Sequence, residues 1–415
     1  MFATLFGREI KQILRSLVYY LYILILALFL STQLKDSDWV KDTAKPTPGQ
    51  ESYGLKASGD EQAVMGQTLA DLVTEVDRET FATYPLGFYK GVTPGEEELQ
   101  DLKKIVENCT GKSWDRLMEE QEAYYAQFDM QDTASSVKAS QMYTVEPREG
   151  LTYGQFKKEM EKVVSIIGKG SDYEEKKFES GAAVPMTYEE ALEEYQVMCE
   201  SDKITGAYMR LFCDYAGIML AFLPMFLGVT RCLRDKRAQA VQVIHARSAS
   251  SVSIVLSRYL ANVFMAFVPV VILGFFLQLP YCYHAHTLGI RPDYFAFLTY
   301  PVVWLLPEIM VVMAVAFFLT ELSDKIFAIF IQIFWGLASI MSASTLTGDF
   351  GGHLVCRWNT VGETTNYLAQ KQELYLNRGL YAVAAVVLTV LCIGVYEKKR
   401  REGESLYGKI FQVRR

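Results

Sequence analysis

Six runs of apolar residues, each close to the length that a helix needs to cross a membrane, constrain this chain most strongly. A transmembrane helix requires about 20 mainly apolar residues, and it satisfies its own backbone hydrogen bonds within the lipid. Of the 415 residues, 51% are hydrophobic. The runs lie at residues 17–34, 207–229, 252–279, 295–320, 326–346 and 380–396. We therefore expect an α-helical polytopic membrane protein with six transmembrane helices.

A long polar insertion separates the first two runs. Residues 35–203 contain 19 Lys and Arg against 35 Asp and Glu, a net charge of −16, whereas the rest of the chain carries +9. Residues 41–59 are rich in Pro, Gly and Ser and are typical of a linker. Helical periodicity follows at residues 61–76, 96–106, 114–125, 153–167 and 187–199. Residues 35–206 are therefore predicted to form a mainly helical extracellular domain that is long enough to bury its own core.

The distribution of Lys and Arg predicts the orientation. Short basic loops stay on the cytoplasmic side of a membrane, and long domains are exempt from this rule. Three segments are basic, with three, five and seven Lys and Arg: residues 1–16, 230–251 and 397–415. The loops at 280–294 and 347–379 contain only one and three. We expect both termini to be cytoplasmic and residues 35–206 to be extracellular.

Residues 1–16 have the pattern of an amphipathic helix. Phe2, Phe6, Ile10 and Ile13 recur at helical spacing, while the cationic side chains lie on another face: Arg8, Lys11 and Arg15. Such a helix lies along the inner surface of a membrane, in contact with lipid. A cleaved signal peptide is the competing interpretation. The absence of an A-x-A-like site after the first run favours an uncleaved span.

The connection at residues 230–251 is the most cation-dense link between two spans. Its charged side chains are Arg231, Arg234, Asp235, Lys236, Arg237 and Arg247. Asp235 is the only acid among them. Besides indicating the cytoplasmic side, this loop is where we expect contact with a soluble partner.

The motifs of common enzymes do not occur in the sequence. The nearest approach to a phosphate-binding loop is Gly111-Lys112-Ser113, but Val106 occupies the position of the required upstream glycine. No G-x-S-x-G or H-E-x-x-H is present. We expect this chain to be no enzyme itself and to bind no cofactor and no nucleic acid.

The two short outer loops contain candidate metal ligands. One carries Cys282, His284 and His286, and the other His353 and Cys356. Nitrogen and sulfur ligands suit zinc or copper if the loops meet. A Cys282–Cys356 disulfide, or unpaired side chains at the membrane rim, remain open as alternatives.

The other cysteines are assigned by their surroundings. Cys109 and Cys199 belong to the predicted extracellular domain, where a disulfide would persist. Cys213 and Cys392 lie in apolar spans and are expected to be small buried hydrophobes.

Polar residues inside the spans are a further set of candidates. Glu308 follows Pro307 in the fourth span, and an acid at that depth is a candidate for a translocation path. Alternatively, it is neutral or bonded to backbone groups that Pro307 leaves free. Asp214 and Arg210, one turn apart, are interpreted as an ion pair near the interface.

The fifth span is rich in small residues, which either pack a neighbouring helix closely or line a subunit interface. They are Gly336, Ala338, Ser339, Ser342, Ala343 and Ser344.

The order of these features resembles the permease subunit of ABC-2-type transporters, in particular the bacterial branch with a large extracellular domain between the first and second spans. The local resemblance is strongest over residues 231–260. There such permeases carry an R-D-x-R-type run, a short helix and an S-x-x-x-x-x-x-K/R approach to the third span. Here these are Arg234-Asp235-Lys236-Arg237, residues 238–247, and Ser251 to Arg258. The family often has E-x-G-T after the basic run, whereas Ala238-Gln239-Ala240 follow Arg237 here.

The resemblance implies a specific function. In the family, the inner loop supplies a coupling helix that docks on an ATP-binding subunit, which holds the ATP and Mg²⁺. It also implies a second permease copy or a paralogue, and a bacterial plasma membrane location. The alternative is a non-transporting scaffold or receptor of the phage-infection or secretion-accessory type. A third hypothesis is a protein that handles copper or zinc without ATP. This hypothesis depends on the His and Cys residues of the outer loops.

Overall fold

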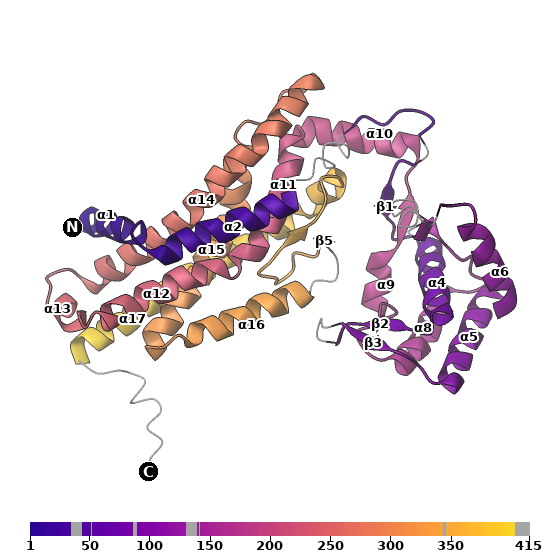
Figure 1. The fold of residues 1–415 in the computed structure, drawn as a ribbon, viewed down its shortest axis with the longest axis horizontal. Helices are drawn as coiled ribbons and strands as arrows, with labels where there is room; N and C mark the ends of the chain where they lie inside the picture. Colours follow the sequence, from indigo (N-terminus) through magenta and orange to yellow (C-terminus); the bar gives the residue numbers. More distant parts are fainter. Residues whose placement is uncertain are drawn as a thin grey trace, which may run out of the picture. The chain divides into compact units, whose positions relative to one another are not determined.

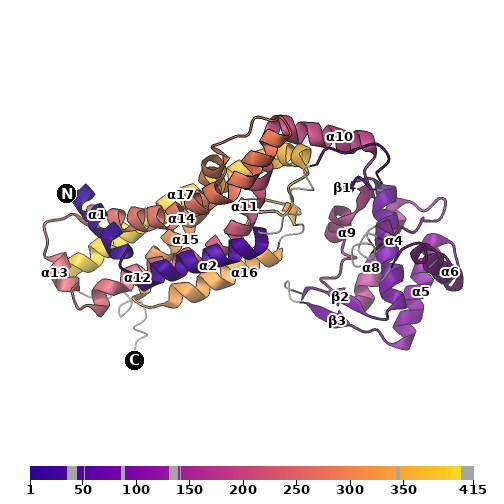
Figure 2. The ribbon, with the colours of Figure 1, turned by 45° about the horizontal axis from the view of Figure 1, so that its top comes forward.

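The computed structural model describes residues 1–34, 44–50, 52–85, 89–129, 139–140, 142–342 and 346–402. The chain is mainly helical and divides into two compact units (Figures 1 and 2). Unit 1 combines Met1–Lys45 with Glu194–Arg415, and unit 2 is Pro46–Glu193. The predicted insertion of one polar domain into a membrane chain thus has a structural counterpart, with its boundaries at residues 46 and 193 in place of 35 and 206.

Unit 1 is built from helices that run along one another. In chain order they are α1 (Phe2–Ile13), α2 (Leu17–Leu34), the π-helix η2 (Met198–Asp202), α11 (Thr205–Leu220), α12 (Leu223–Arg237), α13 (Val241–His245), α14 (Ser251–Thr287), α15 (Ala296–Ser323), α16 (Phe327–Ser342) and α17 (Thr364–Glu402). Between α16 and α17, β5 (Thr347–Gly348) pairs antiparallel with β6 (Arg357–Trp358). Helix α15 is central, because it packs against α11, α12, α14, α16 and α17.

The described residues contain four helices long and apolar enough to cross a membrane: α2, α14, α15 and α17. The pair α11 and α12 would supply a fifth span if it crosses as one bent unit. The 16 residues of α16 extend about 24 Å at 1.5 Å per residue, less than a hydrocarbon core of about 30 Å. The chain is therefore a helical, membrane-type protein with four or five candidate spans, and the sixth remains a prediction.

The predicted second span is broken in the middle. Helix α11 ends at Leu220, α12 begins at Leu223, and the two axes differ by 40°. Pro224 explains the break, since its ring would clash with the carbonyl group of Leu220 in a continuous helix and it has no N–H to donate. Beyond the bend, α12 continues to Arg237, so the first residues of the predicted 230–251 loop are helical.

Two helices are longer than their apolar runs. Helix α14 continues eight residues past the predicted boundary at 279 and includes Pro280 within it. Helix α17 begins at Thr364, well before the predicted start at 380. Much of both predicted outer loops is consequently helical, because a helix continues into polar sequence wherever its exposed face can be solvated.

Unit 2 has a separate hydrophobic core around α4 (Glu61–Asp77). Its other helices are α5 (Glu96–Thr110), α6 (Trp114–Tyr125), α8 (Tyr153–Ile167) and α9 (Glu175–Gly181), and α10 (Tyr188–Val197) crosses the division between the units. The five helices predicted from periodicity correspond to α4, α5, α6, α8 and α10. Residues 35–43, where the predicted domain begins, lie outside the described residues.

Side-chain caps explain where the helices of unit 2 begin. The Asp60 carboxylate accepts a hydrogen bond from the Ala63 N–H at 3.0 Å at the start of α4. Thr152 and Gln155 form a reciprocal capping box at the start of α8.

Two antiparallel pairs of three-residue strands complete unit 2. Strand β1 (Leu55–Ala57) pairs with β4 (Ala183–Pro185), and β2 (Phe81–Thr83) pairs with β3 (Lys90–Val92). These strands are too short to show a period-two pattern in the sequence.

Two glycines of unit 2 provide a matched test of packing. Both have positive φ, +84° at Gly170 and +81° at Gly150. A Cβ atom on Gly170 would lie 2.7 Å from the carbonyl carbon of Tyr84, whereas nothing lies within 4 Å of one on Gly150. Gly150→Ala should therefore cost about 1 kcal/mol of unfolding free energy from backbone strain alone, and Gly170→Ala about 1–3 kcal/mol more from the clash.

Urea unfolding of residues 46–193 expressed alone, followed by circular dichroism, would measure both variants. Equal losses for Gly150→Ala and Gly170→Ala would contradict the close approach of Tyr84 to Gly170.

Candidate functional site

The most unusual feature of unit 1 is a set of charged side chains buried among apolar helices. Removing a charge from water costs several kcal/mol unless a partner compensates for it. Each of these side chains therefore either takes part in function or helps to specify the fold. The residue that it pairs with indicates which of the two roles it has.

Glu308, the predicted candidate for the translocation path, faces Arg378 of α17. Their Oε2 and Nη2 atoms are 3.4 Å apart, and both side chains are almost completely buried. The second guanidinium nitrogen, Nη1, donates to the Leu354 carbonyl group at 2.9 Å. Gly217 of α11 leaves room for the carboxylate, since a Cβ atom there would be 3.4 Å from Oε2.

Neither carboxylate oxygen of Glu308 receives a hydrogen bond from any described residue. The alternative that Glu308 bonds to backbone groups that Pro307 leaves free is thus not what the structure shows. The contact with Arg378 is therefore an ion pair without a hydrogen bond, at a place where α11, α15 and α17 meet.

The predicted ion pair between Asp214 and Arg210 is wrong. Asp214 accepts hydrogen bonds from Arg357 Nε at 2.8 Å and from the Trp358 N–H at 2.6 Å. Arg210 instead pairs with Asp202 and donates to the Val361 carbonyl group. The segment 357–361 therefore offers both charged residues more hydrogen bonds than a single pair one turn apart could supply.

At the other end of the bundle, the predicted coupling residues fall into two groups. Arg231 is buried and makes a two-pronged ion pair with Glu9 of α1, including an Nη2–Oε1 distance of 2.7 Å. Asp235 bonds to Arg231 and to Arg258 of α14. These two residues join α1, α12 and α14 and are not available to a partner.

The remaining cations of this segment are exposed: Arg234, Lys236, Arg237 and Arg247. Helix α13 adds an apolar contact surface, since Val243 is 64% exposed. Burial and the nearby Arg400 lower the pKa of His245, which disfavours its charged form. The exposed charge of this segment therefore comes from these four side chains.

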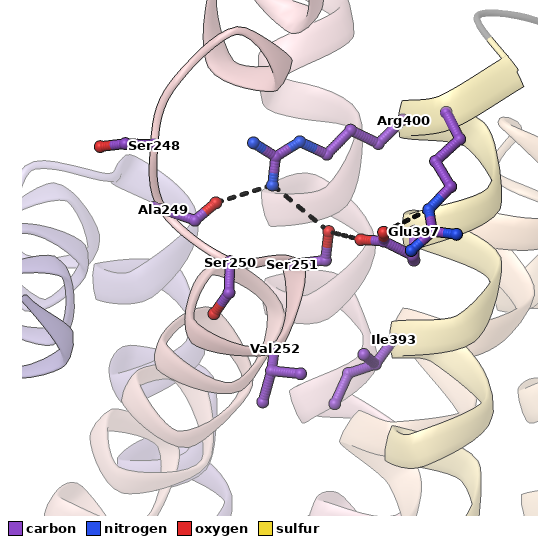
Figure 3. Close-up of a pocket in the computed structure, with 9 residues that line it drawn as sticks. Ser248, Ala249, Ser250, Ser251, Val252, Ile393, Glu397 and Arg400 are labelled. Carbon is purple, nitrogen blue, oxygen red and sulfur yellow. Dashed lines mark hydrogen bonds and ion pairs between the residues drawn. The ribbon is translucent and has the colours of Figure 1, made fainter.

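Arg400, near the end of α17, anchors the turn that follows α13. It donates through Nε to the His245 carbonyl group at 2.9 Å, through Nη1 to that of Ala249 at 2.7 Å, and through Nη2 to that of Arg247. Figure 3 shows this guanidinium reaching from α17 to the turn, with Ser251 bonded to Glu397 beside it. One side chain thus satisfies three carbonyl groups, that of the last residue of α13 and those of two residues beyond it.

Helix α17 holds a second non-helical turn in the same way. Asn377 Nδ2 donates to the carbonyl groups of Phe350, Gly351 and His353 at 2.9 to 3.0 Å. The Tyr381 hydroxyl donates to the Gly352 carbonyl group at 2.8 Å. With the bond from Arg378 to Leu354, α17 fixes the segment 350–354 from its middle part and the segment 245–249 near its C-terminal end.

The candidate metal ligands do not assemble. Within the described ranges, no group of three or more His, Cys, Asp or Glu side chains is arranged to hold a metal ion. His286 contacts the Tyr294 hydroxyl at 2.7 Å, and His353 contacts Ser342 at 3.1 Å. Cys282 accepts from Gln278, and Cys356 faces Asn377. His284 Nε2 is buried without a hydrogen-bond partner among the described residues.

The proposed disulfides are also absent from the described cysteines, because Cys109, Cys199, Cys282 and Cys356 are all free thiols.

Of the small residues of α16 that the structure describes, Gly336 and Ser339 are buried in the bundle, whereas Ala338 and Ser342 are exposed. A Cβ atom on Gly336 would lie 2.5 Å from the Phe222 ring, so the glycine admits that ring at the bend between α11 and α12. Ser339 accepts the Val355 N–H at 3.0 Å. Ala343 and Ser344 lie outside the described residues. Close helix packing thus explains Gly336 and Ser339.

Sequence reasoning missed Arg378, Asn377 and Arg400. The first two were placed in a predicted outer loop, and Arg400 was counted only as a basic residue of the tail. One signal was available for Arg378, because a buried acid such as Glu308 needs a cation nearby and Arg378 lies two residues before an apolar run.

Comparison of the chain with protein-family models, curated proteins and solved structures returned no match.

The Glu308–Arg378 pair yields a stability prediction. Arg378→Met leaves Glu308 buried without a cation, which should destabilise unit 1 by about 3–5 kcal/mol. Adding Glu308→Gln removes the uncompensated charge, so the double variant should recover most of the loss. Thermal unfolding in detergent would rank the stabilities of three purified chains: the wild type, Arg378→Met and the double variant. A double variant no more stable than Arg378→Met would contradict the pairing.

Proposed function

We propose that this chain is the permease subunit of an ATP-driven export complex and that it couples to a separate ATPase through residues 230–251. The observation that carries the proposal is the construction of the α12–α13 end. Its exposed cations and Val243 are accessible to a partner, while Arg400 fastens the adjoining turn to the longest helix of the bundle. A segment that is both exposed and anchored in this way can receive a force and pass it on.

The long helix α17 would carry that force. It has 39 residues without a break, and Arg400 follows Arg378 by 22 residues, about 33 Å along a helix. Closure of the ATPase subunits would press on the 241–250 segment, and Arg400 would move α17 with it. The middle part of α17 holds the segment 350–354 and faces Glu308, so a displacement there would change the surroundings of the buried carboxylate.

The remaining parts of the proposal follow from the resemblance to ABC-2-type permeases. ATP and Mg²⁺ would be bound by the partner ATPase, and a second permease copy or a paralogue would complete the path. The protein would lie in a bacterial plasma membrane with α13 on the cytoplasmic side and residues 35–206 outside.

A mild-detergent pull-down from the native membrane, followed by mass identification, tests this function. Recovery of a soluble protein with a Walker motif is the expected result. Recovery of only membrane or envelope proteins would favour a non-transporting scaffold or receptor and would leave residues 230–251 as a topology signal.

Charge reversal should separate docking from folding. Arg234→Glu with Arg237→Glu should weaken ATPase binding by about tenfold or more, since both side chains are exposed and would repel an acidic surface. The matched control is Lys398→Glu with Arg401→Glu, which changes the charge equally at the same end of the bundle. Co-purification yield and ATPase-linked transport measure the effect. Full transport by the Arg234/Arg237 variant would refute the assigned role.

Removal of the Arg400 anchor should uncouple the complex without preventing docking. Arg400→Gln leaves three carbonyl groups without their donor, so amide hydrogen exchange in residues 241–250 should accelerate, and exchange in 350–358 should also rise if α17 transmits the change. Arg401→Gln is the control, because among the described residues Arg401 bonds only Glu397, and its side chain is 77% exposed. Unchanged exchange in both segments of the Arg400 variant would exclude the anchor.

A further inference from the structure

A pocket with aromatic walls opens between α15, α17 and η2, at the end of the bundle opposite α13. Its volume is about 230 Å³, and its walls include Asp202, Tyr300, Trp304, Tyr367, Lys371 and Tyr375. Trp304 and Tyr367 are buried with nearly parallel rings, while Tyr375 is 50% exposed at the opening. The pocket is therefore closed by aromatic faces on the inside and accessible from one side.

The acceptor in this pocket is already satisfied. The Asp202 carboxylate receives hydrogen bonds from Arg210, from the Thr364 hydroxyl at 2.8 Å and from the Tyr300 hydroxyl at 3.2 Å. Arg210 in turn lies over the Tyr367 ring, 4.5 Å from its centroid. A ligand therefore finds the one negative charge of the wall neutralised by a buried cation.

The wall of the pocket also carries a cation without a partner. Lys371 lines the pocket and forms no ion pair within the described part of the chain. An unpaired ammonium group beside aromatic faces, with Asp202 already neutralised, favours a ligand that supplies acceptor oxygens.

The backbone beside the pocket is strained. The π-helix η2 ends at Asp202, and the next two residues have positive φ, 51° at Lys203 and 65° at Ile204. Positive φ is rare for a β-branched residue such as Ile204. Strained backbone and short π-helices occur often at binding sites, where they fix a side chain in place. Here they fix Asp202, and through it Arg210 and Tyr300.

We propose that this pocket binds an organic anion with an apolar body. The carboxylate or phosphate group would pair with Lys371, while the body would lie against the rings of Tyr300, Tyr367 and Tyr375. A free organic acid and the acidic head of a lipid share this chemistry. The proposal goes beyond export, and it can be tested on this chain alone without any ATPase.

Isothermal titration calorimetry of the full chain in phosphatidylcholine nanodiscs would test the site, with octanoate as the probe and octanol as its neutral counterpart. We expect saturable binding of octanoate, at least tenfold tighter than octanol. Lys371→Gln should weaken octanoate binding by about tenfold, and Lys371→Arg should retain it. Lys398→Gln is the control, since Lys398 is an exposed lysine near the other end of the same helix. Equal affinities for octanoate and octanol, or an unchanged affinity in Lys371→Gln, would overturn the proposal.

A second arm identifies the source of the anion. If the natural ligand is a lipid, nanodiscs that contain phosphatidylglycerol should compete with octanoate and reduce its apparent affinity severalfold in the wild type but not in Lys371→Gln. If it is a free acid, octanoate binding should be the same in both kinds of nanodisc. Competition that persists in Lys371→Gln would place the lipid elsewhere, and the pocket would then lose the lipid assignment.

Discussion

The cost of burying an unpaired charge governs the structure of unit 1. Among helices that are apolar on most faces, each buried charge needs a partner, and the partners come from distant parts of the chain. Glu9 pairs with Arg231 across 222 residues of sequence, and Asp214 pairs with Arg357 across 143. Such pairs admit few alternative arrangements of the helices. They define which helices are neighbours more sharply than apolar packing alone can.

The same requirement applies to the backbone where the chain leaves a helix. Carbonyl groups of the segments 245–249 and 350–354 have no partners in a helical ladder, and burial without a partner would be costly for them. Arg400, Asn377 and Arg378 provide donors from one continuous helix. Because these side chains lie at two separate levels of α17, they tie both turns to one continuous helix. This construction is the reason for proposing that α17 transmits movement between the two turns.

Much of the architecture was predictable because it depends on local sequence. Apolar runs of the right length located α2, α14, α15 and the core of α17, and helical periodicity located α4, α5, α6 and α8 in unit 2. What the sequence did not reveal depends on distant partners. The polar first part of α17 looked like a loop because nothing local shows that Asn377 and Arg378 face the bundle. The exposed and buried cations of residues 230–251 are alike in sequence, and only Glu9 and Arg258 distinguish Arg231 and Asp235 from the rest.

Strands β1 and β4 have a further consequence for how the chain is organised. They lie side by side with Leu55 opposite Pro185, near the two points where the chain enters and leaves unit 2. When the two ends of an inserted domain are paired in this way, the domain places little constraint on the rest of the chain. It can be lengthened, exchanged or lost as a cassette while the flanking helices keep their connection. The acidic unit is thus free to diverge at a different rate from the membrane helices, so related chains could share the bundle and differ almost completely in what they present outside it.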